Sequence, residues 1–111
     1  MRLAFLDPGQ FSARLELEAP VATPDGQGGA DIAWHPVAAL WALVEPVSQA
    51  FSEIAGAEAA TISHRIWLRF RADLAAGQRL RKGARVFSIR TARDPDESRR
   101  YLVCYCEEEG R

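Results

Sequence analysis

The chain has 111 residues, of which 48% are hydrophobic and 26% charged, as is typical of one soluble globular domain. No apolar run approaches the roughly 18 residues of a membrane-spanning helix, and the N-terminus lacks the apolar core of a signal peptide, so cytoplasmic synthesis is expected. The formal net charge is only −1, which conceals strong local imbalances along the chain.

The first third of the chain predicts an arm, a strand and a loop. Residues 1–10 contain the turn signal Asp-Pro-Gly and are expected to form an N-terminal arm. Residues 11–19 alternate, with Phe11 counted on the apolar side, which predicts a strand with one solvated face that Pro20 ends. Residues 23–31 hold three glycines and a Pro-Asp-Gly turn, so they predict an exposed hairpin loop.

The following stretch is apolar on both faces. Because Pro36 interrupts it, we expect a short strand over 32–35 and a longer one over 38–45. Alternation divides the longer strand into two faces, Leu40, Ala42 and Val44 against Trp41, Leu43 and Glu45. A strand of this kind needs cover on both faces.

Within the inter-strand segment 46–61, residues 48–61 change character and become rich in alanine and glutamate. Ser48 is a plausible N-cap, and Phe51 and Ile54 follow at helical spacing. A helix this short is marginal by itself in water. The pattern therefore predicts a short helix or an excursion between two strands.

The remaining residues predict strands joined by turns. A strand is expected over 62–71, two more over 79–92 around a Lys-Gly turn, and a last one over 101–108, followed by a charged tail at 108–111. About six strands with one short helix predict a mainly β fold, a small antiparallel barrel or sandwich.

The segment HRIWLRFR, residues 64–71, raises the main functional question. With a period of two, its apolar face is Ile66, Leu68 and Phe70. The opposite face carries Arg65, Trp67, Arg69 and Arg71. A strand face of this composition suits another protein chain, a nucleic acid, or solvent.

Catalytic, metal and redox chemistry is not indicated. Cys104 and Cys106 share one side of a strand, too far apart for a comfortable disulfide, and are expected to be free thiols. His35 and His64 are not at zinc-finger spacing, and Ser63 and His64 are expected on opposite faces, a poor catalytic pair. We expect no enzyme activity, no metal and no cofactor.

Charges are segregated along the chain. Residues 1–63 carry two basic and eight acidic side chains, a balance of −6, residues 64–93 a balance of +8, and residues 94–111 a balance of −3. Segregation of this kind bears on association rather than on the fold.

Four segments together resemble the head–tail joining, or head-closure, proteins of tailed phages, which include stopper and adaptor proteins and also occur in prophages and gene transfer agents. The segments are GQFSARLELEAP, DGQGGADIAWHPVAALWALVEPVS, SHRIWLRFRADLAAGQRL and FSIRTARDPDESRRYLVCYCEE. They span nearly the whole chain, 1–111, which we therefore treat as a single head–tail connector domain.

The resemblance implies a β-barrel that assembles into a ring of six or twelve copies in a phage-like particle made in the bacterial cytoplasm. A portal or adaptor protein lies above the ring and a tail protein below, and packaged double-stranded DNA passes through the lumen. The ring retains DNA and docks the tail, without catalysis and without a membrane.

Within this interpretation, particular residues are candidates for two roles. The candidates for subunit or ring-to-ring contacts are Arg65, Trp67, Arg69, Arg71, Arg90, Glu16 and Glu18. A solvated or intramolecularly paired face and direct phosphate contact remain open for the arginine face. The segment 46–61 either gates the channel or caps the barrel, with Gln49, Phe51, Glu53 and Glu58 as channel candidates.

Two alternatives belong to other classes. One is an OB-like nucleic-acid-binding barrel that uses the basic stretch 64–93, although Trp67 is the one clear stacking aromatic there. The other is an unspecialised protein-interaction module.

Overall fold

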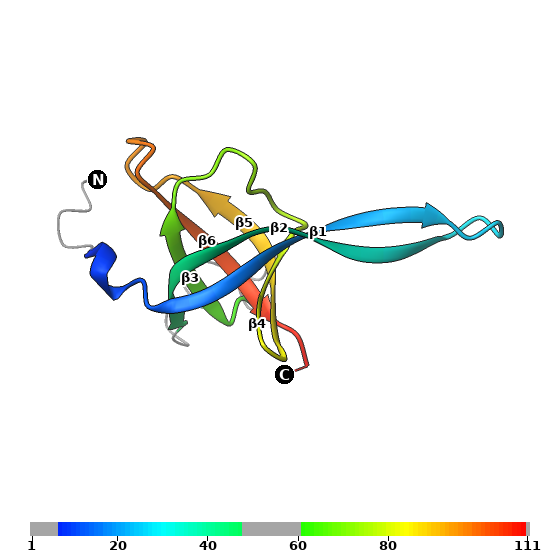
Figure 1. Ribbon diagram of the computed structural model, residues 1–111, viewed down its shortest axis with the longest axis horizontal. Coiled ribbons are helices and arrows are strands. Elements are labelled where there is room, and N and C mark those ends of the chain that lie inside the picture. The colour runs from blue at the N-terminus through cyan, green and yellow to red at the C-terminus, as the bar shows by residue number, and fades with distance from the viewer. Residues whose placement is uncertain (1–6, 48–60, 111) are drawn as a thin grey trace.

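The computed structural model describes residues 7–47 and 61–110. The elements are η1 (Pro8–Gln10), β1 (Ala13–Pro24), β2 (Ala30–Pro46), β3 (His64–Arg69), β4 (Arg79–Lys82), β5 (Arg85–Arg93) and β6 (Tyr101–Glu108) (Figure 1). Within this part of the chain, no helix has the length and apolar character needed to cross a membrane.

The six strands close into an antiparallel barrel in the order β1-β2-β3-β6-β5-β4, in which β4 pairs with β1. Closure leaves no long free edge within the barrel itself, which matters in so short a chain. The closing seam is short, since only residues 16–18 of β1 pair with residues 79–81 of β4. The predicted mainly β antiparallel fold is confirmed, and of the two predicted forms, barrel and sandwich, it is the barrel.

The core fills the inside of the barrel with inward side chains from every strand. Its completely buried members include Leu15, Leu17, Ile66, Leu68, Leu80, Cys104 and Cys106. The predicted apolar face of β3 is confirmed for Ile66 and Leu68, whereas Phe70 lies just after the strand and packs against the same core. Both cysteines are free.

Two expected strand breaks are wrong, because β1 continues through Pro20 and β2 is one strand through Pro36. The pairing register shifts beside Leu17 and Glu18, where Val37 forms a bulge next to Pro36. Prolines are tolerated here because β2 pairs with β3 only from Ala42 onward and β1 pairs with β4 only over residues 16–18, so the outer edge of each strand has no ladder partner beside its proline.

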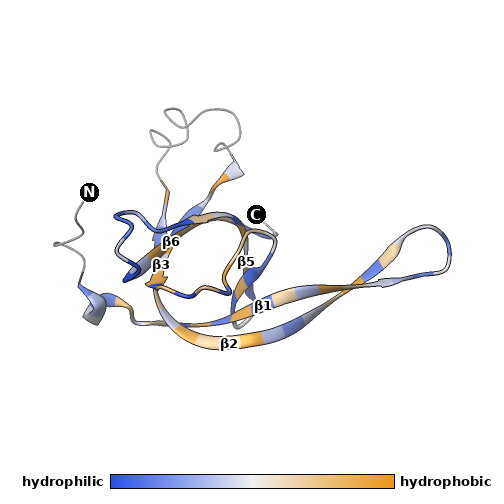
Figure 2. Ribbon diagram, turned by 90° about the horizontal axis from the view of Figure 1, so that it is seen from above, coloured by the Kyte–Doolittle hydropathy of each residue, from blue (hydrophilic) through white to orange (hydrophobic). Residues whose placement is uncertain are grey.

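The outer halves of β1 and β2 form a two-stranded hairpin that projects from one side of the barrel (Figures 1 and 2). We call residues 19–35 the arm, which is distinct from the N-terminal arm predicted over residues 1–10. With the arm, the molecule is 51 Å long and 31 Å wide. At its tip, Asp25 accepts hydrogen bonds from the backbone N–H groups of Gln27 and Gly29, at 2.8 and 3.1 Å. The predicted hairpin loop is confirmed.

The helix or excursion predicted over 46–61 falls mainly on residues 48–60, which lie outside the described residues. Pro46 at the end of β2 pairs with His64 at the start of β3. The end of β2 and the start of β3 therefore lie side by side at one end of the barrel.

Candidate interaction surface

Two side chains on the outer face of β3 contact the carboxylate of Glu45 on the neighbouring strand β2. The indole N–H of Trp67 donates to Oε1 of Glu45 at 2.5 Å, and Nε of Arg65 lies 3.8 Å from the same oxygen. All three side chains are half-buried. Two of the predicted contact residues thus share one intramolecular partner, an arrangement that the sequence left open.

An aromatic cluster covers the outside of β2, β3 and β6. Phe11 and Tyr101 meet edge to face, with ring centroids 5.7 Å apart, and Leu43 and Trp67 pack against them. The assignment of Phe11 to the inner face of the first strand is therefore wrong. Phe11 follows η1 and precedes β1, so it turns back over the outside and supplies the cover that the second face of β2 required.

Glu16 and Glu18 face β4 rather than the arginines of β3. Nε of Arg79 donates to Glu18 at 2.7 Å, and Arg81 donates to Glu18 at 3.1 Å and to Glu16 at 2.6 Å. Glu18 is only 6% exposed. Burial raises the pKa of Glu18, but the hydrogen bonds and charges of the two guanidinium groups outweigh burial and lower its pKa overall.

Other basic side chains of residues 64–93 also have acidic partners. Arg71 binds Asp73 through two nitrogens, at 3.0 and 2.9 Å. The further pairs are Arg85 with Glu108 and Arg90 with Glu107. Charges that are segregated along the sequence are therefore largely paired in space.

Arg69 differs from these arginines. Its side chain is exposed, and among the described residues no carboxylate lies within ion-pair distance of it. Arg69 is thus the member of the predicted set with a guanidinium available to another molecule.

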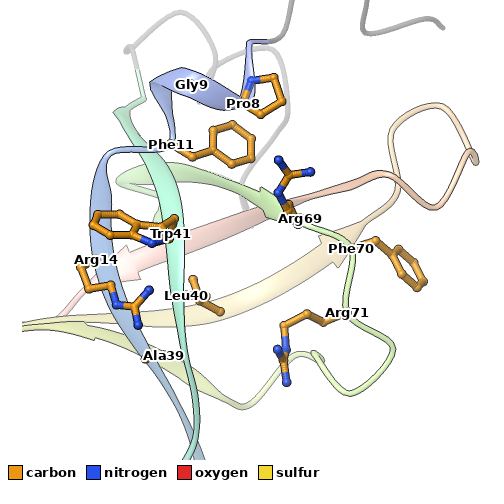
Figure 3. A pocket seen from close by; sticks show the side chains of 10 residues that line it. All are labelled: Pro8, Gly9, Phe11, Arg14, Ala39, Leu40, Trp41, Arg69, Phe70 and Arg71. Atoms are coloured by element: carbon orange, nitrogen blue, oxygen red, sulfur yellow. The ribbon is translucent and has the colours of Figure 1, made fainter.

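Arg69 lines a cleft of about 570 Å³ that the sequence did not predict. Arg14 and Trp41 of β1 and β2 lie along one part of it and Arg69 and Arg71 along another, with Phe11 near η1 (Figure 3). We call this the aromatic–basic cleft. The guanidinium of Arg14 lies 5.0 Å from the centre of the Trp41 ring, and Trp41 is 54% exposed.

The only sequence signal for this cleft was the outward position of Trp41 on an apolar strand. Arg14 lies opposite Trp41 in the β1–β2 register, but that pairing is fixed by the hairpin and is not visible in either strand alone.

A polar cluster closes one end of the barrel. Ser63 Oγ lies 2.9 Å from Nδ1 of His64, so the expectation that these side chains point apart is wrong, because Ser63 precedes the strand. The Ser63 hydroxyl also accepts from the backbone N–H of Glu108, and His64 is buried against Phe87. These contacts give the pair a structural role.

The predicted channel residues Gln49, Phe51, Glu53 and Glu58 lie outside the described residues. Their role stays a prediction.

Comparison with known proteins gives consistent matches over most of the chain. The family model described as phage head completion protein matches residues 6–109. The solution structure of protein SF1141 from Shigella flexneri 2a is similar, with a TM-score of 0.75 and 30% sequence identity, over 95% of this chain and 98% of that chain.

A second similar structure comes from the virion of a native gene transfer agent particle. Its TM-score is 0.64 and its identity 27%, over 87% of this chain and 94% of that chain. None of the curated proteins compared with the chain matches it.

Proposed function

The chain belongs to the phage head completion protein family, and from this membership we infer that it forms a ring between the portal or adaptor of a capsid and the tail. It is a structural protein of a phage or phage-like particle. In the proposed position, the ring retains packaged double-stranded DNA and presents a docking surface to the tail. Six or twelve copies form this ring.

One observation carries the proposal. The match to a chain of the gene transfer agent virion covers 87% of this protein, and the family model covers all six strands. The likeness therefore concerns the whole barrel and arm rather than a shared motif.

The closed barrel limits how copies can associate. Because closure leaves free strand edges mainly on the arm, copies join through side-chain surfaces or through the arm. A ring also requires two different surfaces on each copy, which meet head to tail.

The proposed contact surface includes the outer face of β3 with Arg90, Glu16 and Glu18. Since Arg69 lacks an intramolecular acid among the described residues, it can bind a neighbouring molecule without breaking an existing ion pair. A contact that used Glu18 or Arg90 would first have to replace the partner that each already has.

The nucleic-acid-binding alternative is weakened by the same pairs. Arg79, Arg81 and Arg85 lie in the basic stretch, yet each binds a carboxylate of the same chain. A surface that is neutralised in this way attracts phosphates less than its sequence suggests.

The direct test is to delete the gene for this chain in its phage-like particle and supply it from a plasmid. Without the chain, we expect capsids that lose DNA and tails that remain unattached, as seen by electron microscopy and nuclease protection. The wild-type plasmid should restore complete particles. Formation of DNA-filled, tailed particles without the chain would contradict the proposal.

A substitution series refines this test. Arg69→Glu should reduce the number of copies retained in particles at least several-fold. Lys82→Glu is the matched control, because Lys82 is also exposed and lies at the opposite end of the β3–β6–β5–β4 part of the barrel. Equal retention of both variants would remove Arg69 from the contact surface.

A further inference from the structure

The arm has one face made entirely of apolar residues. In the β1–β2 register, opposed residues share a face and successive pairs alternate between faces. One face therefore consists of Pro20, Ala22, Pro24, Ala30, Ile32 and Trp34. The other face contains Thr23, Asp31 and His35 and is mixed in polarity.

Little within the described chain covers this apolar face. Ile32 is 54% exposed, and Trp34 is half-buried beneath the guanidinium of Arg79, which lies 4.2 Å from its ring centre. A two-stranded hairpin beyond the edge of a barrel is marginal in water. A contiguous exposed apolar ribbon of this kind marks a contact surface.

The aromatic–basic cleft has the complementary character. Its apolar lining includes Phe11 and Trp41, and its charges are guanidinium groups, of which Arg14 and Arg69 have no carboxylate partner among the described residues. The arm carries Asp25 at its tip and no lysine or arginine, whereas Asp31 lies on its other face. The apolar surfaces therefore match, and the acidic tip has a charge opposite in sign to that of the cleft.

The occupant of the cleft is a second copy rather than the same chain's arm. The arm projects from one side of the barrel, whereas η1, which borders the cleft, lies on the opposite side (Figure 1). The β1–β2 ladder holds the arm in this direction along its whole length. An arm of one copy can thus meet the cleft of another copy but not its own.

We propose that the apolar face of the arm of one copy docks into the aromatic–basic cleft of the next copy around the ring. This inference rests on the proposed ring and specifies how its copies join. In the proposed ring the contact is head to tail, because the arm of each copy meets the cleft of the next, and its repetition joins all copies of the ring. The small alanine and proline side chains of the arm let its backbone approach the cleft closely.

Disulfide trapping in assembled particles tests the contact. Full-length variants combine Ala39→Cys in the cleft with either Ala22→Cys or Ala30→Cys on the apolar face of the arm. The matched control combines Ala39→Cys with Ala33→Cys, because Ala33 is also exposed but lies on the other face of the arm. All positions are exposed alanines, so each variant should retain the fold.

The native cysteines do not interfere, because Cys104 and Cys106 are completely buried. After mild oxidation, we expect at least one apolar-face pair to give a ladder of covalent oligomers on a non-reducing gel. A disulfide requires Cβ atoms within about 4.5 Å, so the control should give at least tenfold less product.

The outcomes separate this inference from the proposed function. If imaging shows rings in the particles but neither apolar-face pair gives a ladder, the docking contact is wrong and the ring proposal stands. A control ladder as strong as the others, or product that stops at dimers, also contradicts the contact. If particles contain no ring, both proposals fail.

Discussion

Among single residues, Glu18 has a position with consequences for the whole barrel. It lies in the short β1–β4 seam and binds Arg79 and Arg81 from the strand that completes closure. Removal of its charge leaves two guanidinium groups without their shared carboxylate at a largely buried site.

We therefore expect Glu18→Gln to lower the free energy of unfolding by about 2–3 kcal/mol at neutral pH. The pKa of Glu18 is lowered in the folded state, so its contribution is present above the unfolded-state pKa and is lost as the pH falls through the folded pKa. Urea unfolding of the wild type and the variant should show their stabilities converging as the pH falls below the ordinary glutamate pKa of about 4.3.

Glu97→Gln is the control for this series, because Glu97 is exposed in a loop. It should change the stability by less than about 0.5 kcal/mol across the same range. A Glu18→Gln deficit that stays constant into acid would show that the ionised carboxylate is not the stabilising group.

Cys104 and Cys106 give a second prediction at the residue scale. Burial raises the pKa of the Cys104 thiol to about 12, and burial together with the neighbouring Cys104 also raises the pKa of Cys106. The reactive thiolate is therefore scarce at pH 8 in the folded protein.

We expect a thiol-specific chromogenic reagent to modify neither cysteine at pH 8 in native buffer, on the timescale in which it modifies free cysteine. Both should react at once in denaturant, which serves as the internal control. Rapid labelling of the native protein would mean that this part of the core opens readily.

At the scale of elements, the β1–β2 hairpin combines two tasks in one continuous pair of strands. Its inner half supplies Leu15, Leu17 and Leu40 to the core, while its outer half leaves the barrel as the arm. The bulge at Val37 marks the point between these halves. The arm is thus anchored rigidly by the same strands that build the barrel.

The segment between β2 and β3 is the element on which channel gating was predicted. Deletion of residues 49–58, with the remaining ends rejoined, should leave rings in the particles because the barrel strands are intact. Gating predicts that such particles lose DNA, measured as nuclease-sensitive genome relative to wild type. Full DNA retention in ring-bearing particles would reject gating and favour a capping role.

For the whole molecule, the distribution of charge in space matters more than its distribution along the chain. The basic stretch 64–93 has a balance of +8 in sequence, but its pairs with Glu16, Glu18, Glu107 and Glu108 spread that charge across neighbouring strands. Within the described residues 64–93, six of the eight arginines therefore lie within ion-pair distance of a carboxylate of the same chain.

From this we expect the isolated chain to bind DNA only weakly. A fluorescence titration with single- and double-stranded DNA should give dissociation constants weaker than about 10 μM at physiological salt, with a shallow dependence on salt. The Arg69→Glu variant should weaken even this binding, because Arg69 remains available. Tight binding with a steep salt slope would favour the OB-like alternative over a purely structural role.

The sequence by itself determined the features that depend on local pattern. Alternation in HRIWLRFR identified Ile66 and Leu68 as core residues, and the glycine-rich segment near Asp25 identified the hairpin loop. These predictions held because side-chain period and turn chemistry are properties of consecutive residues. The mainly β class and the approximate number of strands followed from the same patterns, whereas the choice between barrel and sandwich did not.

Only the tertiary structure decided which distant residues meet. Phe11 packs outside the barrel against Tyr101, Glu18 binds Arg79 across the closing seam, and Arg14 stacks on Trp41 beside the cleft. Each contact depends on strand order and register, which the packing of the whole chain fixes and which no single segment encodes. The prolines within β1 and β2 were misread for the same reason, since whether a strand edge is free is decided by its neighbours.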